Sequence, residues 1–408
     1  MTVRIETIGS GGDGVARDGD QKLFVALTAP GDLVTIEARG ERGRLIDILE
    51  PSPLRADPVC RHFGACGGCA FQHLSRVEEA RWKTAQITDA LTREGVAAAR
   101  INPLLTFPAA SRRRAAFAVR RVKGAVKFGF NELRSDNVVD IEECPVLAPS
   151  LAARIAALGA FAATVPADAF DLAATACENG LDVNIVALRL NMATVGAMRA
   201  LRDAGVLRLS LNGDVALALG EPVVMFDGIA VTPPPGAFLQ ASREGEAALI
   251  GLVKAAAGQA RRIADLFSGC GTFALPLAKS ASISAFDSDP AAIEALKRAA
   301  SAAQASGAPV HPLRAEPRDL FERPLSAKEL KRFDAVVFDP PRAGAEAQAA
   351  EIAKSGVPLV VGVSCNPRTF ARDAGLLAAG GYRLVEVTPV DQFVYSPHIE
   401  LVGVFAKR

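Results

Sequence analysis

Ile263-Ala-Asp-Leu-Phe-Ser-Gly-Cys-Gly-Thr272 is an apolar run that leads into a tight, glycine-containing turn. Its first five residues predict a buried strand, and the turn predicts a helix over residues 273–279. Glycines in such a turn let backbone amides come close to a ligand. A second predicted strand, residues 283–286, ends at Asp287, where a carboxylate can accept hydrogen bonds from ribose hydroxyls. The stretch therefore predicts an α/β fold that binds a nucleotide.

The glycine turn alone leaves two enzyme classes open. Gly269, Gly271 and Ala274 satisfy the pattern of dinucleotide oxidoreductases, but enzymes that use S-adenosylmethionine have the same strand, turn and helix. Downstream, a predicted strand over residues 334–338 ends in Asp339-Pro-Pro-Arg342, whose prolines fix an extended backbone. A nicotinamide enzyme has no evident use for this motif together with the cysteine turn and acidic motif that follow. An enzyme that transfers a methyl group to a pyrimidine carbon would use all three motifs.

Cys365 lies in Ser364-Cys-Asn-Pro-Arg368, between a predicted buried strand over 358–363 and a predicted helix over 369–379. Asn366 suits the N-cap of that helix and Pro367 its first position. We therefore expect Cys365 at the carboxyl edge of the sheet, where α/β folds bind ligands. A helix N-terminus is expected to favour its thiolate. A buried core thiol is the alternative for a cysteine taken alone.

The amino-acid composition limits which classes of protein are possible. The 408 residues suffice for two or three domains, and 50% hydrophobic with only 6% aromatic residues favours an α/β enzyme. A net charge of +1 means that any binding to nucleic acid must depend on a local basic patch. The N-terminus has no secretory pattern, and no apolar run approaches the roughly 20 residues of a membrane span. We therefore expect a cytoplasmic protein whose seven cysteines serve metal binding or catalysis rather than disulfides.

Residues 1–53 predict a small β module, because short strand candidates alternate there with glycine-rich turns. Such spacing is typical of a small barrel. The pattern resembles the TRAM domain, an OB-like RNA-binding module of RNA-modifying enzymes.

Cys60, Cys66 and Cys69 have the spacing C-x5-C-x2-C, and Cys144 follows in Ile141-Glu-Glu-Cys-Pro145. Thiolates from a glycine-rich loop, with a lone fourth ligand before a proline, favour a 4Fe–4S cluster. Structural zinc is the main alternative, although four-cysteine zinc sites more often show two close pairs.

Residues 111–134 form a local basic patch on a predicted hairpin. Phenylalanines are interleaved with the charges, and cationic strands with aromatic residues can hold a nucleic-acid backbone and stack bases. A solvated face of an ordinary hairpin is the alternative. The basic residues are Arg112, Arg113, Arg114, Arg120, Arg121, Lys123, Lys127 and Arg134, and the aromatic ones are Phe117, Phe128 and Phe130.

Taken together, these motifs resemble the RNA (uracil-C5)-methyltransferase family, in particular its iron–sulfur enzymes acting on 23S ribosomal RNA, over essentially the whole chain. The motifs include C-x5-C-G-G-C, Phe238-Leu-Gln240, residues 265–272, Asp339-Pro-Pro-Arg342, Ser364-Cys-Asn-Pro367 and His398-Ile-Glu400. The resemblance implies Cys365 as the nucleophile and Glu400 as the base. It also implies a pocket for cofactor and target base formed by Gln240, Phe267, Thr272, Asp287 and Asp339, with Asp319 as a candidate for the adenine amino group. Family members often have glutamate in place of Asp287 and asparagine in place of Thr272.

The expected architecture is an α/β chain with three parts: an OB-like TRAM barrel (1–53), a central α+β domain with the iron–sulfur cluster and basic hairpin (54–235), and a Rossmann-like methyltransferase domain (236–408). The expected activity is methylation of uridine C5 in RNA with S-adenosylmethionine. Ribosomal RNA is favoured over transfer RNA, and the expected enzyme is a monomer. A non-catalytic iron–sulfur RNA-binding protein and an oxidoreductase are the alternatives from other classes.

Overall fold

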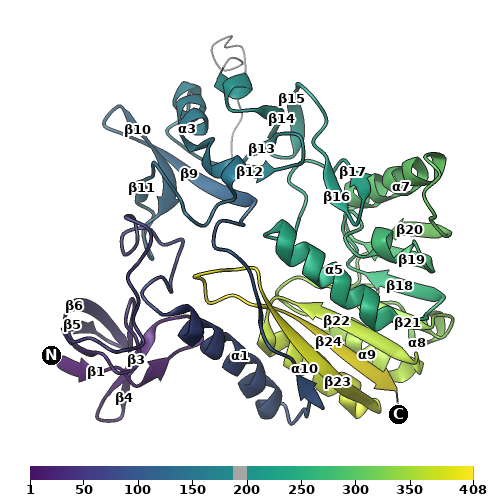
Figure 1. Ribbon diagram of the computed structural model, residues 1–408, viewed down its shortest axis with the longest axis horizontal. Coiled ribbons are helices and arrows are strands. Elements are labelled where there is room, and N and C mark those ends of the chain that lie inside the picture. The colour runs from purple at the N-terminus through teal and green to yellow at the C-terminus, as the bar shows by residue number, and fades with distance from the viewer. Residues whose placement is uncertain (187–199, 408) are drawn as a thin grey trace.

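The computed structural model describes residues 1–186 and 200–407 (Figure 1). The N-terminal part is a six-stranded sheet in the order β1-β5-β6-β4-β3-β2. Alternate residues of β5, Val34 and Ile36, point into a small core with Leu23 and Val25. The strands are β1 (Thr2–Arg4), β2 (Thr7–Ile8), β3 (Gly14–Asp18), β4 (Gln21–Val25), β5 (Leu33–Arg39) and β6 (Arg42–Glu50). The predicted short strands are confirmed.

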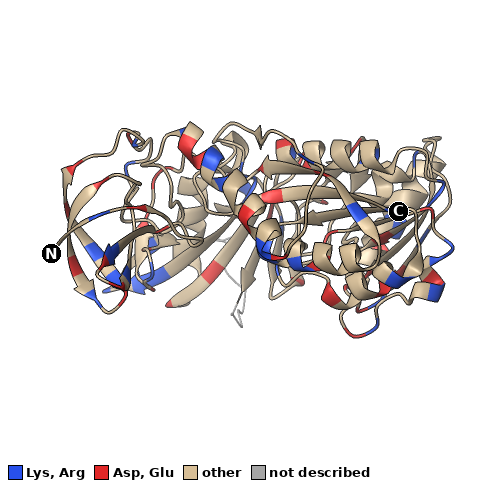
Figure 2. Cartoon of the chain, turned by 90° about the horizontal axis from the view of Figure 1, so that it is seen from below, with Lys and Arg blue, Asp and Glu red and all other residues tan. Residues whose placement is uncertain are grey.

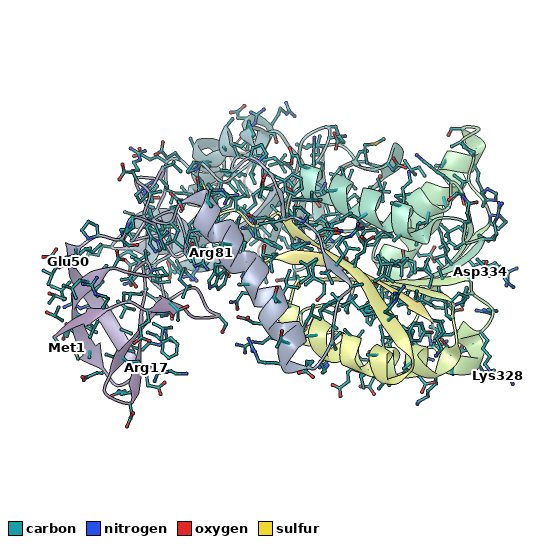
Figure 3. The ribbon with its side chains drawn as sticks, turned by 60° about the horizontal axis from the view of Figure 1, so that its bottom comes forward. Met1, Arg17, Glu50, Arg81, Lys328 and Asp334 are labelled. Atoms are coloured by element: carbon teal, nitrogen blue, oxygen red, sulfur yellow. The ribbon has the colours of Figure 1, made fainter. Side chains whose placement is uncertain are left out.

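Helix α1 (Arg76–Arg93) joins this sheet to the C-terminal half. It begins at Ser75, whose hydroxyl accepts a hydrogen bond from Glu78 N at 3.2 Å. Trp82 packs edge-on against Phe71 near the N-terminal sheet, whereas Ile87 belongs to a core of the C-terminal half. In Figure 3, Arg81 on this helix lies between Met1 at one end of the molecule and Lys328 at the other.

The central part is a seven-stranded sheet in the order β11-β10-β9-β12-β13-β14-β15, with only the β13–β14 pair parallel. Helices α2 (Pro149–Ala152) and α3 (Ile155–Thr164) cover it through Leu151, Leu158 and Phe161. The predicted basic hairpin is confirmed, and it turns at Lys123 and Gly124, both with positive φ. The strands are β9 (Arg114–Val122), β10 (Ala125–Asn131), β11 (Val138–Asp140), β12 (Ala169–Ala176), β13 (Leu181–Val186), β14 (Val206–Leu211) and β15 (Asp214–Ala218).

A nine-stranded sheet dominates the C-terminal half, with the path β20-β19-β18-β21-β22-β24-β23-β7 and β8 paired to β23. Strands β18 to β22 run parallel, and β24 is antiparallel to β22. β7 and β8 come from before the basic hairpin, so an early segment completes this sheet. The strands are β7 (Arg100–Ile101), β8 (Leu105–Thr106), β18 (Arg262–Leu266), β19 (Ser282–Asp287), β20 (Leu313–Pro317), β21 (Ala335–Phe338), β22 (Leu359–Ser364), β23 (Tyr382–Asp391) and β24 (Glu400–Lys407). A separate pair, β16 (Val224–Phe226) and β17 (Ile229–Val231), precedes it.

Helices cover both faces of this sheet, which is why its central parallel strands β21 and β22 are apolar apart from Ser364. One face packs on α5 (Arg243–Ala257), α6 (Ala274–Leu277) and α7 (Pro290–Ala305). The other packs on α1, α8 (Ala327–Leu330), α9 (Glu346–Ser355) and α10 (Pro367–Ala379). Adjacent residues Val336 and Val337 of β21 enter opposite cores, as the period of a strand requires. The predicted strands and α10 with its Asn366 N-cap are confirmed, while the helix predicted over 273–279 is only the single turn α6.

Basic and acidic residues are interspersed from end to end of the molecule (Figure 2). None of the helices in the described ranges combines the length and apolar character that crossing a bilayer requires.

Candidate active site

A cavity of about 540 Å³ lies where β18, β19, β21 and β22 end, the edge at which open α/β sheets bind ligands. Its volume is typical of small-ligand pockets. The predicted site residues that line it are Phe267, Thr272, Asp287, Asp319, Asp339, Cys365 and Glu400. Gln240 is buried beside it and donates from Nε2 to Asp339 Oδ2 at 3.1 Å. The fold thus brings the whole predicted set together.

The turn after β18 leaves room for a ligand. Phe267 has a φ of 62°, a left-handed conformation that is strained in a non-glycine residue. A Cβ atom added to Gly269 would meet no atom within 4 Å, so this residue faces open space. The hydroxyl of Ser268, which also lines the cavity, has no hydrogen-bond partner among the described residues. Since buried polar groups are normally paired, a polar ligand fits this turn.

Asp287 holds the same turn against the end of β19. Its Oδ2 accepts a hydrogen bond from Gly269 N at 2.8 Å, and its Oδ1 accepts one from Asp289 N at 2.9 Å. Each carboxylate oxygen can accept a second bond, so Asp287 can both fix the turn and bind a hydroxyl. Beneath it, burial raises the pKa of Asp265 well above its usual range, helped by the charges of Asp339 and Asp287.

Aromatic rings line the cavity. Phe267 and Phe321 lie with their ring centroids 5.5 Å apart at an angle of 55°. Asp319 Oδ1 accepts hydrogen bonds from Phe321 N at 2.9 Å and Glu322 N at 3.3 Å, which fixes the loop that presents Phe321. Phe238 is 71% exposed and also lines the cavity. Flat, apolar ligand groups can stack on such rings.

Four polar side chains form a continuous hydrogen-bonded row beside Cys365. Gln392 Nε2 donates to Glu400 Oε2 at 2.9 Å and to Gln240 Oε1 at 2.7 Å. Gln240 Nε2 in turn donates to Asp339 Oδ2, and Gln392 Oε1 accepts from Ala241 N at 2.9 Å. The row therefore connects the carboxyl groups of Glu400 and Asp339.

Both carboxyl groups of this row hold their protons unusually strongly. Burial raises the pKa of Glu400, and the neighbouring Asp339 charge raises it further, against a smaller lowering by Gln392. Burial also raises the pKa of Asp339, partly offset by Gln240. The pair can therefore gain or lose a proton near neutral pH, which is the property that a general base needs.

The Cys365 thiol holds its proton strongly in the free protein. Burial raises its pKa to about 12, the charges of Glu400 and Asp339 add to the effect, and Arg342 lowers it. Burial and two carboxylates outweigh the backbone amide at the start of α10, which does lower the pKa of Cys365, as expected of a helix N-terminus, so the net shift is upward.

Residues 391–396, which include Gln392, are fixed in position by ion pairs and hydrogen bonds to buried charged side chains of α1. Lys83 is 0% exposed, and its Nζ contacts Asp391 Oδ1 at 2.5 Å, Glu79 Oε1 at 2.7 Å and the Phe393 carbonyl at 2.9 Å. Glu79 Oε1 also accepts from Tyr395 N at 2.8 Å. Figure 1 shows this C-terminal loop reaching between the three parts of the chain.

Three arginines of the predicted basic patch do not form an RNA-facing surface. Arg113 is buried, pairs with Glu246 and donates to Gln240 O at 3.0 Å. Arg114 donates to Leu239 O at 2.7 Å. The guanidinium group of Arg112 lies 5.9 Å from the Phe393 ring centroid. This part of the prediction is wrong, because these residues join the central sheet to the active site.

The interleaved phenylalanines are also not a base-stacking surface. Phe117 and Phe128 are buried, with centroids 4.6 Å apart, and Phe130 lies 5.3 Å from Phe117. They pack in the core between the hairpin and α3. Lys123 and Lys127 remain exposed on the hairpin.

The four cysteines of the predicted cluster, Cys60, Cys66, Cys69 and Cys144, line one cavity of about 260 Å³. All four are free thiols, and burial raises the pKa of Cys69 to about 12, with the neighbouring cysteines adding to the shift. Within residues 1–186 and 200–407, no three or more histidine, cysteine or acidic side chains are arranged to hold a metal ion.

The open α/β sheet, its glycine turn and the thiol–carboxyl cavity define an S-adenosylmethionine-dependent methyltransferase. Residues 234–408 match the family model described as tRNA (Uracil-5-)-methyltransferase. Across its whole length the chain is 46% identical to an RNA methyltransferase of Caulobacter vibrioides, with 99% of each chain covered. It is 34% identical to the 23S rRNA (uracil(1939)-C(5))-methyltransferase RlmD of Chromohalobacter salexigens, covering 97% of this chain and 87% of that one. The chain belongs to the RNA (uracil-C5)-methyltransferase family.

A solved structure supports the fold. The tRNA (uracil-54, C5)-methyltransferase of Pyrococcus abyssi, in complex with S-adenosyl-L-homocysteine, superposes with a TM-score of 0.77 at 24% identity, over 100% of both chains. The mixed α/β methyltransferase fold is therefore confirmed.

Sequence reasoning missed several residues of the cavity. Gln392 was not predicted, although it stands in the same acidic motif as Glu400. Phe321, two residues after Asp319, also lines the cavity, as do Arg342 and His398 of the motifs Asp339-Pro-Pro-Arg342 and His398-Ile-Glu400. The position of Phe321 close to Asp319, a predicted cofactor ligand, is the feature of the sequence that could have identified it as a residue of the cavity.

Proposed function

We propose that this enzyme methylates C5 of a uridine in 23S ribosomal RNA, with Cys365 as nucleophile and Glu400 as base. The observation that carries the proposal is that both side chains line one cavity with Asp339, while Gln392 connects Glu400 to Gln240. The identity to the 23S enzyme over almost the whole chain favours ribosomal RNA. Transfer RNA is the second candidate, because the matching family model is named for it.

Uracil C5 is a poor nucleophile until a thiolate adds to C6. The Cys365 thiol first gives its proton to solvent, and its sulfur then bonds to C6 while the electrons of the C5–C6 double bond move toward O4 as an enolate. S-adenosylmethionine, when bound, would supply the methyl group that C5 takes, and its methyl–sulfur bond would break to leave S-adenosylhomocysteine. Glu400, as carboxylate, then removes the proton of C5, the C6–sulfur bond breaks, and Cys365 leaves as a thiolate.

The remaining residues bind and orient. The open turn at Gly269, with Ser268 and Thr272, fits the amino-acid part of the cofactor, and Asp287 fits its ribose hydroxyls. Phe267 and Phe321 suit a flat adenine, with Asp319 holding their loop. Gln240 and Asp339 face the target base. That base must leave its stack to reach the cavity.

Cys60, Cys66, Cys69 and Cys144 would hold a 4Fe–4S cluster. The support is that all four thiols border one cavity, and that the C-x5-C-x2-C spacing with a lone fourth cysteine before a proline favours a cluster over structural zinc. Methyl transfer needs no electrons, so its part would be structural.

The domain division of 1–53, 54–235 and 236–408 is proposed on the six-, seven- and nine-stranded sheets, with β7 and β8 as the part of the second range that joins the third sheet. The N-terminal sheet would be an OB-like TRAM barrel that binds RNA. We propose a monomer that acts in the cytoplasm.

The test is methyl transfer from labelled S-adenosylmethionine to 23S ribosomal RNA that lacks the modification. Digestion should release 5-methyluridine, and transfer RNA should be a poorer substrate. Absence of product with any RNA would overturn the proposal, and product only on transfer RNA would reassign the substrate.

A further inference from the structure

A second pocket of about 340 Å³ adjoins the active-site cavity. The two share Cys365, Arg342 and His398 in their linings. From there the second pocket extends to the turn after β2 in the N-terminal sheet, to α1 and to the first turn of α10. Its other lining residues include Ser10, Arg93 and Arg368, and none of the residues that line it is acidic.

The pocket carries positive charge that the described residues leave unneutralised. Arg93 and Arg368 are exposed, and Arg368 Nη2 donates to the uncharged Ser10 Oγ at 2.8 Å. Arg342 Nη2 faces His398 Nδ1 at 3.3 Å rather than a carboxylate. Within the described part of the chain, Arg93, Arg342 and Arg368 form no ion pair. Three guanidinium groups that line one pocket and form no ion pair with a described residue suit a phosphate-bearing ligand.

His398 adds an uncharged donor. Burial and the charges of Arg342, Arg112 and Lys83 lower its pKa to about 4, so its ring is neutral at neutral pH. Because Nδ1 faces the Arg342 guanidinium, Nδ1 is the acceptor and Nε2 carries the hydrogen. That hydrogen is available to an oxygen of a bound nucleotide.

The chemistry of the base decides what lies beside Cys365. The sulfur attacks C6, and C6 is bonded to N1, the atom that carries the ribose. When C5 faces the cofactor cavity, the ribose and its phosphates must therefore lie close to Cys365 and leave the cavity there. The second pocket begins at Cys365, and it is the arginine-lined one.

We propose that this second pocket binds the ribose and the flanking phosphodiester of the target uridine, through Arg93, Arg342 and Arg368. The inference rests on the proposed function and adds where the RNA strand enters the site. The turn at Ser10 in the N-terminal sheet would then help to position the RNA strand, because Ser10 accepts a hydrogen bond from Arg368 and orients it.

The test measures binding of a 23S ribosomal RNA fragment to the full-length enzyme over a range of salt concentrations. Arg93→Ala and Arg368→Ala should each weaken binding several-fold and reduce the slope of log K against log salt by about 0.7 per lost phosphate contact. Arg368→Lys should retain most of the slope, because a point charge remains. Arg314→Ala is the matched control, since Arg314 is exposed on β20 outside both pockets.

A methylphosphonate placed on either side of the target uridine locates the contact. In the unmodified enzyme, one of the two uncharged linkages should weaken binding, and in the Arg93→Ala/Arg368→Ala double variant it should have little further effect. Equal effects in both proteins, or slopes matching the Arg314→Ala control, would overturn the pocket assignment. S-adenosylmethionine affinity should stay unchanged throughout. Methylation by the unmodified enzyme is measured in parallel, so failure of the proposed function is seen separately from failure of the pocket.

Discussion

Gln392 donates a hydrogen bond from Nε2 to Glu400 Oε2 at 2.9 Å. The other hydrogen of the same amide goes to Gln240 Oε1, and its oxygen accepts from Ala241 N. Both hydrogens of the amide are thus used, and rotation of the amide would break three hydrogen bonds at once. Gln392 therefore orients Glu400, the proposed base, through fixed geometry, without touching the reacting atoms in any step that we propose.

Replacing Gln392 with methionine keeps its length and removes these bonds. Since a hydrogen bond to a charged group contributes about 1.5–3 kcal/mol, kcat should fall about 10- to 100-fold. Attack by Cys365 should persist, so the covalent RNA adduct should accumulate on ordinary uridine, as seen by denaturing electrophoresis. Gln348→Met is the control, because Gln348 is also buried but, among the residues that the structure describes, its side chain hydrogen-bonds to the backbone of Leu325 alone. Loss of rate without adduct would argue against a positioning role.

Glu400→Gln should change the pH dependence of stability. The folded-state pKa of Glu400 is raised, so the folded protein binds more protons than the unfolded chain between the two pKa values. The free energy of unfolding should therefore fall as pH rises through this window, by up to about 1.4 kcal/mol per pH unit for this group. Denaturant unfolding should show a shallower fall in the variant, which should be more stable than the unmodified protein above neutral pH. Parallel curves would refute the raised pKa.

Lys83→Met tests the buried charges that hold residues 391–396. Removing Lys83 takes away the buried ammonium group between Asp391 and Glu79 and leaves the half-buried Arg76 as the cation that pairs with both carboxylates. The free energy of unfolding should therefore fall by at most about 3–5 kcal/mol, the cost of a broken buried pair. Activity of the folded fraction should fall as well, because Asp391 precedes Gln392. Thermal unfolding and kcat should both be unaffected in Lys328→Met, whose side chain is exposed on α8. An unchanged melting temperature in Lys83→Met would show that the buried contacts contribute little.

Cys69→Ser tests the proposed cluster. Anaerobically purified enzyme should be brown with about four irons per chain, and the variant should lose most of that iron. Cys177→Ser is the matched control, because Cys177 is a buried free thiol outside the cysteine cavity. A colourless protein with one zinc ion would contradict the cluster.

The C-terminal half could be read closely from the sequence because its strands are short apolar runs bounded by turn residues. Asp287, Asp339 and Cys365 follow such runs, and the ends of parallel strands meet at one edge of the sheet. Gln392 could not be found in this way. Its importance comes from Gln240 and Ala241, which are distant in sequence and adjacent only after folding.

The basic patch shows what the sequence pattern could not predict, namely the contacts that its arginines make. Charge and strand pattern located the hairpin but could not reveal that Arg113 and Arg114 meet the carbonyls of Gln240 and Leu239. The net pKa of Cys365 could not be predicted for a similar reason. The helix cap is visible in the sequence, whereas the burial and carboxylates that oppose it come from distant segments.

The most direct measurement uses 23S ribosomal RNA with 5-fluorouridine at the target position. Fluorine cannot leave as a proton, so Glu400 cannot release the adduct and Cys365 should remain bonded to C6. A denaturation-resistant enzyme–RNA complex that depends on S-adenosylmethionine is predicted, with mass spectrometry placing the bond at Cys365. The complex should be absent in Cys365→Ala and present in Cys270→Ala, which changes another cysteine beside the cavity. A complex that survives in Cys365→Ala, or none with the unmodified enzyme, would contradict the account.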